Sequence, residues 1–190
     1  MGLREQTREA VRAAIAERAL DLFDRRGFDN TSVDDVAAAA GISGRSFHRY
    51  FPAKEDAVIG ESTGLGQIVA DALAERPVLE PPWLAMRAAL QPIVELSEAN
   101  AQRSRLVMRV VNGSASLRAR NLEKHLAWSR TLTPIVRRRL GDPAGGDVPA
   151  QAIVLAALSC LDAAYAGWVA GDGGSLADLL DLAFDSVATG

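Results

Sequence analysis

The chain has 190 residues, of which 48% are hydrophobic and 24% charged, enough for one sizeable globular core or a small domain fused to a larger one. No 18 consecutive residues are uncharged and apolar, and the charged N-terminus lacks the apolar stretch of a secretory signal, so neither a membrane span nor export is expected. The single cysteine, Cys160, excludes a disulfide framework and is typical of a reducing compartment, which predicts a cytoplasmic protein.

The net charge of −3 conceals an uneven distribution of charged side chains. Residues 43–54 hold three basic side chains and no acid. Residues 103–139 carry ten basic side chains and one acid, whereas residues 140–190 carry seven aspartates and no basic side chain. The chain therefore contains one small and one large basic segment, balanced by an acidic tail.

Strong helix formers dominate the whole sequence, and no run alternates apolar and polar residues with a period of two, so we predict an all-α fold. Glycines, prolines and capping serines mark the ends of about nine helices. In chain order these are expected at residues 12–26, 33–40, 44–50, 52–75, 83–99, 102–111, 117–140, 150–170 and 175–188. Three prolines at positions 77, 81 and 82 interrupt the chain and suggest a boundary between an N-terminal module and a C-terminal body.

The segment 31–54 has the sequence TSVDDVAAAAGISGRSFHRYFPAK. Ser32 and Asp35 form the pattern of a capping box, so a short helix is expected to follow and to end before Gly41. Ser43 is placed to cap a second short helix, and two short helices joined by a tight glycine turn are what a helix-turn-helix requires. We expect the second helix to bury aromatic side chains and to present its polar residues outward, where they can enter the major groove of DNA.

Several further residues fit one family pattern at matching offsets, and they cover about residues 12–60. They are Leu22-Phe23, Gly27, Ser32-Val33, Ala40-Gly41-Ile42-Ser43 and Tyr50-Phe51-Pro52-Ala53-Lys54-Glu55. In these residues the chain resembles the TetR/AcrR family of transcriptional repressors. The resemblance implies a three-helix DNA-binding module followed by a helical bundle that binds an effector and dimerises. Ser46 and His48 stand where the family commonly has Thr and Tyr, so we expect the sequence preference to differ.

Among the outward residues, Arg45 is the best candidate for reading a base, because a guanidinium can bond both O6 and N7 of guanine. Ser46 and His48 are expected to reach a base or a phosphate, and this choice stays open. Arg49 and Lys54 are expected to bind phosphates, and the resemblance supports this role for Lys54. Taken singly, each of these side chains would more often do no more than keep an exposed helix solvated. The expected DNA-binding set is Thr31, Ser32, Ser43, Gly44, Arg45, Ser46, His48, Arg49, Tyr50 and Lys54.

The sequence contains no nucleophile arrangement, phosphate-binding loop or pair of carboxylates that would indicate an enzyme. His125 with Cys160 or Asp162 lacks the spacing of metal ligands, and we interpret these residues as packing or exposed groups. We therefore expect no catalytic residue, no metal and no cofactor.

The family usually builds an effector cavity from apolar side chains, so the resemblance implies a small-molecule ligand. The candidate wall residues are Met86, Leu90, Met108, Asn112 and Trp128. The basic segment 103–139 has three interpretations: a solvated surface, which we favour, a site for an anionic effector such as a carboxylate or an acyl-coenzyme A, or nonspecific contact with DNA.

The apolar helix expected at 150–170, together with the last helix, carries more apolar surface than one small domain must bury, which predicts a homodimer. The candidate interface residues are Ile153, Ala157, Leu161, Ala164, Trp168, Leu180 and Phe184. The expected organisation is a DNA-binding module at 1–52, a connecting helix at 53–76, and an effector-binding and dimerisation domain at 77–190. The leading hypothesis is a ligand-responsive repressor bound to double-stranded operator DNA. The alternatives are a constitutive DNA-binding regulator and, with least support, a helical enzyme or interaction module.

Overall fold

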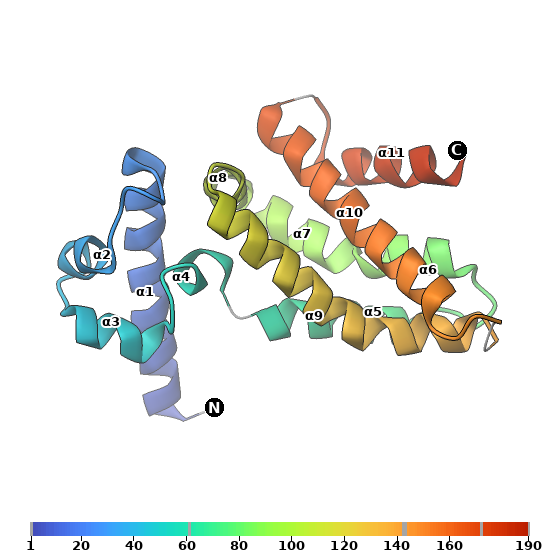
Figure 1. Cartoon of the computed structure of the whole chain (residues 1–190), viewed down its shortest axis with the longest axis horizontal. Helices are drawn as coiled ribbons and strands as arrows, with labels where there is room; N and C mark the ends of the chain where they lie inside the picture. The colour runs from blue at the N-terminus through green and yellow to red at the C-terminus, as the bar shows by residue number, and fades with distance from the viewer. Residues whose placement is uncertain (1, 61, 142–143, 172, 190) are drawn as a thin grey trace. The chain divides into compact units, whose positions relative to one another are not determined.

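The computed structural model describes residues 2–60, 62–141, 144–171 and 173–189, and over these residues the secondary structure is entirely helical (Figure 1). The prediction of an all-α fold is therefore confirmed. The helices group into two compact units, and neither unit is a single continuous stretch of chain. The first unit comprises Met1–Gly60 and Leu106–Asn121, and the second comprises Glu61–Arg105 and Leu122–Gly190.

The first unit is built on four N-terminal helices, α1 (Leu3–Arg26), α2 (Val33–Ala39), α3 (Gly44–Tyr50) and α4 (Asp56–Ile59). Large apolar side chains from these helices share one core with residues of the 106–121 segment. The aromatic members of this core are Phe23, Phe28, Phe47 and Phe51. Burying these four rings holds together helices that are too short to be stable alone.

The second unit contains α5 (Ser62–Glu75), α6 (Pro82–Ala89), α7 (Gln91–Ala99), α10 (Val148–Ala170) and α11 (Leu176–Ala188). The remaining helices, α8 (Ala101–Asn112) and α9 (Ala115–Arg139), each contribute residues to both units. By length and composition α10 is apolar enough to cross a membrane, which the sequence did not predict. In this fold, however, α10 contributes eight side chains to the core of the second unit and packs on α11.

The described helices number eleven rather than about nine because two of the expected helices are divided. The helix expected at 52–75 is interrupted at Gly60, whose φ of 68° is left-handed. The segment therefore forms two helices, α4 and α5. The second is divided at Leu90, where Pro92 lies in the first turn of α7. Pro134, in contrast, lies inside α9 without ending that helix.

The tip of the α8–α9 hairpin is an integral part of the first unit. Val110, Val111 and Leu117 are at most 6% exposed and belong to its core. Three polar contacts add to this packing: Arg109 Nε lies 3.1 Å from Asp24 Oδ1, Ser114 Oγ donates to Asp29 Oδ1 at 3.0 Å, and Arg120 Nη2 lies 2.9 Å from Asp56 Oδ1. The compact units therefore do not follow the continuous division at residue 77 that the proline cluster suggested.

Candidate functional site

The first helix of the helix-turn-helix begins at a complete capping box. Ser32 Oγ accepts from the Asp35 backbone N–H at 3.1 Å, and Asp35 Oδ2 accepts from the Ser32 backbone N–H at 2.8 Å. The hydrogen bonds from Ser32 lower the pKa of Asp35, so the carboxylate stays charged at the positive end of the helix. Gly41, with φ of 69°, then makes the turn toward α3.

The second helix, α3, is positioned by its own cap and by a close approach from α2. Ser43 Oγ accepts from the Ser46 backbone N–H at 3.1 Å. A Cβ on Gly44 would lie 2.6 Å from Asp34 Oδ1, so only glycine leaves that exposed carboxylate where it is. Phe47 is wholly buried and anchors α3 to the core of the first unit.

The opposite face of α3 carries exposed cationic and hydrogen-bonding groups. Arg45, His48 and Arg49 are exposed, while Ser46 and Tyr50 are partly buried. Arg49 lies over the ring of Tyr50 at 5.2 Å, and this stacking restricts its guanidinium. The arrangement presents base-reading and phosphate-binding groups together on one side of a capped helix.

Two of the expected DNA-binding side chains are instead bound within the first unit. Thr31 is 1% exposed, and its hydroxyl donates to the Gly27 carbonyl at 2.8 Å. Lys54 Nζ donates to the carbonyls of Phe28 and Thr31, both at 2.9 Å, and lies 4.1 Å from the centre of the Phe28 ring. These contacts fix the α1–α2 connection. A phosphate contact by Lys54 stays a prediction that competes with this internal role.

Much of the basic segment 103–139 is engaged in internal contacts. The aspartates that pair with Arg109 and Arg120 belong to residues 1–60, and not to the acidic tail. Arg118 donates to the Asn112 carbonyl at 2.6 Å. The arginines of this hairpin tip are therefore structural groups of the first unit. The interpretation as a solvated surface can apply only to the other basic residues of the segment.

The candidate wall residues for an effector are divided between the two units. Met86, Leu90 and Trp128 are at most 3% exposed in the core of the second unit. Met108 and Asn112 lie in the part of α8 that belongs to the first unit. Their expected role as a common ligand site stays a prediction.

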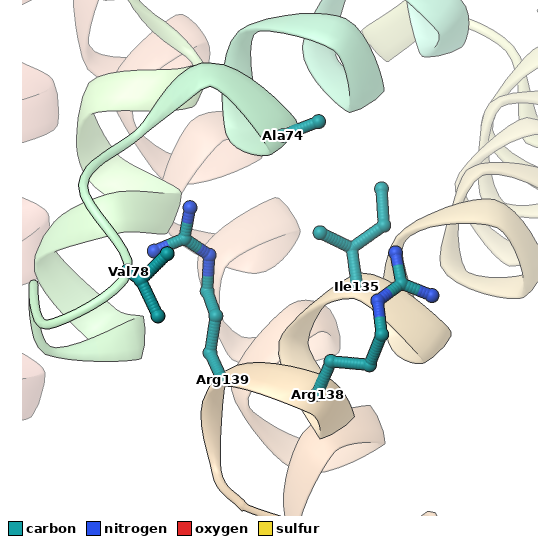
Figure 2. Close-up of a pocket in the computed structure, with 5 residues that line it drawn as sticks. All are labelled: Ala74, Val78, Ile135, Arg138 and Arg139. Atoms are coloured by element: carbon teal, nitrogen blue, oxygen red, sulfur yellow. The ribbon is translucent and has the colours of Figure 1, made fainter.

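A hollow of about 180 Å³ lies elsewhere in the second unit, between α5 and α9 (Figure 2). It is lined by Ala74, Val78, Ile135, Arg138 and Arg139, none of which was expected to bind a ligand. The Arg139 guanidinium donates to the carbonyls of Leu73, Arg76 and Pro77, so it caps the end of α5. The hollow is open to solvent, and its lining includes the exposed cation of Arg138.

Sequence reasoning missed a polar and aromatic cluster between α7, α9 and α10. His125 is 4% exposed, and its Nδ1 lies 3.2 Å from Asp162 Oδ2. The Tyr165 hydroxyl is hydrogen-bonded to that of Ser97 on α7. Burial raises the pKa of Tyr165, and burial lowers the pKa of the neighbouring Lys124 to about 8 against the opposing effect of Asp162. The sequence suggested His125 and Asp162 only as possible metal ligands. Nothing in it indicated that Lys124, Tyr165 and Ser97 would lie near them.

The predicted dimer interface stays a prediction, and the burial of its residues within the protomer counts against it. Six of the seven expected residues are buried in the protomer's own core, where a partner cannot reach their side chains, and Ile153 packs against that core. The six are Ala157, Leu161, Ala164, Trp168, Leu180 and Phe184. The outward face of α10 instead carries small residues spaced three or four apart, which places them on one side of the helix. They are Ala152, Ala156, Ser159, Ala163, Ala166 and Ala170.

The chain is similar to known bacterial regulators over nearly its whole length. It matches the family model for bacterial regulatory proteins of the tetR family over residues 15–58, and that for the MftR C-terminal domain over residues 80–190. It is 33% identical over 179 residues to MftR of Mycobacterium tuberculosis, whose name assigns it to the regulation of mycofactocin biosynthesis, covering 93% of this chain and 88% of that protein. It is 27% identical over 146 residues to the transcriptional regulator TcmR of Streptomyces glaucescens, covering 74% of this chain and 65% of TcmR.

Solved structures show the same fold. A TetR-family regulator from Syntrophomonas wolfei aligns with a TM-score of 0.64 and 19% identity, covering 96% of each chain. FadR of Thermus thermophilus, a TetR-family repressor solved in complex with lauroyl-CoA, aligns with a TM-score of 0.56 and 22% identity, covering 92% of this chain and 91% of FadR. The relatives are transcriptional regulators and not enzymes.

Proposed function

The chain belongs to the TetR family of transcriptional regulators, and from that premise we propose that it is a dimeric repressor released from its operator by a small, hydrophobic and anionic ligand. The observation that carries the proposal is the exposed face of α3. This capped helix presents Arg45, His48 and Arg49 to solvent while Phe47 fixes it to the core. A rigid helix with such a face suits entry into the major groove.

Within this face we assign base reading to Arg45 and phosphate binding to Arg49. Arg45 lies in the first turn of α3, whose N-terminal residues meet base edges when such a helix docks. In the part of the chain that the structure describes, its exposed guanidinium makes no hydrogen bond or ion pair, so its donors stay available to DNA. Arg49 is held beside Tyr50 near the other end of α3, where a charge contact suffices.

Dimerisation is supported by the outward face of α10. The helix has a long apolar sequence, yet only 39% of its most apolar window is buried within the protomer. The small side chains of that face allow a second helix to approach closely. A two-fold contact here would present two recognition helices to two half-sites of the DNA. The centres of these half-sites must lie about 34–36 Å apart.

The nature of the ligand is inferred from chemistry and from one relative. The second unit has an apolar helical core that can open around an apolar body, and α8 and α9 supply cations to meet an acid group. FadR of Thermus thermophilus holds lauroyl-CoA, which makes acyl chains with an anionic head reasonable first probes. The alternative is a constitutive regulator without an effector. Release of the operator by one of these probes would exclude it, and failure of all of them would support it.

The test is fluorescence anisotropy with the DNA immediately upstream of the chain's own gene. Arg45→Ala should weaken binding to this DNA by a factor of about 10–100, corresponding to the 1–3 kcal/mol of a bidentate base contact, while binding to unrelated DNA changes little. Arg130→Ala is the matched control, because it removes an exposed arginine from α9 instead of α3. Equal losses on both DNAs would refute base reading by Arg45. Failure of fatty acids, acyl-coenzyme A esters and neutral apolar compounds to release the operator would favour the constitutive regulator.

A further inference from the structure

The cluster in the second unit forms a strip along one side of α10. Asp162, Tyr165 and Trp168 are spaced three residues apart along α10. Their side chains therefore lie at successive positions over about 9 Å of the helix. The ring centres of Tyr165 and Trp168 are 6.4 Å apart. His125 lies against Asp162 at one end. The side chain of Asp162 is 43% exposed, so the strip reaches solvent at this end.

The cations of this strip lie on aromatic rings instead of carboxylates. Lys124 Nζ lies 5.2 Å from the ring centre of Trp128, and Arg105 Cζ lies 4.4 Å from that of Trp168. Among the described residues neither cation has an ion pair within 4 Å, although Arg109 and Arg120 on the same two helices both do. Lys124 is partly buried, and this burial opposes its charge more than nearby Asp162 supports it. The strip therefore has an excess of positive charge that an incoming anion would compensate.

The strip is also where the aromatic side chains of the second unit concentrate. That unit has five Phe, Trp or Tyr residues, and Trp128, Tyr165 and Trp168 contribute to the strip. Rings, in offset or edge contact, favour another flat ring over a flexible alkyl chain. The Tyr165 hydroxyl, already bonded to Ser97, supplies a polar group beside these surfaces.

We propose that this strip is the recognition site for an aromatic carboxylate, whose acid group pairs with Lys124 and whose ring lies against the half-buried Tyr165. The inference rests on the proposed function only in taking this molecule as the effector. It narrows the ligand from any acidic hydrophobe to a planar one, and it assigns the pairing cation. Arg105, at the far end of the strip, offers a second anchor to a larger acid.

The experiment is calorimetric titration of the full chain with 2-naphthoate, with its uncharged amide 2-naphthamide, and with dodecanoate. We expect 2-naphthoate to bind at least tenfold more tightly than either of the others. Lys124→Met should weaken 2-naphthoate at least tenfold, and Lys124→Arg should restore affinity to within about threefold. Arg138→Met removes the exposed cation of the separate hollow on α9 and should leave binding unchanged. A thermal melt of each variant verifies folding, which Lys124→Met should retain because it replaces a partly buried cation by an apolar side chain of similar length.

Unchanged affinity in Lys124→Met, equal binding of acid and amide, or no binding of 2-naphthoate at millimolar concentration would each overturn the site. Loss of binding in Arg138→Met would move it to the hollow. An operator titration separates the two proposals. If 2-naphthoate binds through Lys124 and leaves the DNA complex intact, the strip stands and ligand-released repression fails. If dodecanoate releases DNA while 2-naphthoate does not bind, the repression proposal stands and the strip fails.

Discussion

Lys54 shows how one side chain can serve the fold where sequence pattern suggests a direct contact with DNA. Its ammonium bridges two backbone carbonyls across the α1–α2 connection and stacks on Phe28. Hydrogen bonds from a charged donor contribute about 1.5–3 kcal/mol, so Lys54→Met should lower the free energy of unfolding by roughly that amount in urea titrations. Arg49→Met, which removes an exposed cation of α3, is the control and should leave stability within about 0.5 kcal/mol of wild type. Unchanged stability in Lys54→Met, accompanied by weaker DNA binding, would instead identify a phosphate contact.

Lys124 predicts a dependence of stability on pH. Its pKa in the folded chain is about 8, below its ordinary value of 10.5, because burial disfavours the charged form. Between these two values the unfolded chain binds more protons than the folded one, so this group makes the free energy of unfolding rise as pH increases from 8 toward 10. In urea titrations at pH 7.5, 8.5 and 9.5, the free energy of unfolding of wild type should therefore rise relative to that of Lys124→Met. A constant difference would show that Lys124 titrates normally.

At the scale of helices, Gly66 is a position of close approach between α5 and α9. A Cβ there would lie 2.5 Å from Cδ1 and 2.7 Å from Nε1 of Trp128, whose side chain is buried at 3% exposure. Gly66→Ala should therefore destabilise the protein by about 1–3 kcal/mol through overpacking. Gly64, on the same helix, faces open space, so Gly64→Ala should gain up to about 1 kcal/mol from helix propensity. Thermal melts of the two variants compare them directly, and a shift of the same sign in both would contradict the close approach.

The elements that sequence predicts well are those determined by local interactions. The bounds of α2 and α3 follow from Ser32, Asp35 and Ser43, whose caps join residues three apart. The internal bonding of Lys54 spans 23 and 26 residues, and periodicity gives no sign of such contacts. The sequence alone does not separate the inward and outward faces of α10, because the helix is apolar on all sides. Small residues lie on both sides of α10: Ala157 and Ala164 enter the protomer core, whereas Ala152, Ala163 and Ala166 remain exposed.

At the scale of the whole molecule, the outward face of α10 predicts how the dimer can be broken. Ala163→Arg places a charge on that face, where a close helix pairing would leave it buried without a partner. We expect this variant to remain folded, to sediment as a monomer, and to lose a factor of about 100 in operator affinity because two half-sites no longer act together.

Gln151→Arg is the control, because it adds the same charge to an exposed position of α10 beside the alanine face. Ala157→Arg should instead unfold the chain, since Ala157 lies in the protomer core. A dimeric Ala163→Arg would show that the contact between protomers lies elsewhere.

The contribution of the hairpin tip to the first unit has a consequence for synthesis on the ribosome. Val110, Val111 and Leu117 complete a core whose other members lie within residues 1–60. At roughly 5–20 residues per second, about 3–12 s separate translation of the two parts. During that interval the nascent DNA-binding helices expose part of their apolar surface. Stalled chains ending near residue 100 should therefore be cleaved by protease within α1–α3, whereas chains long enough to release residue 121 from the ribosome should resist.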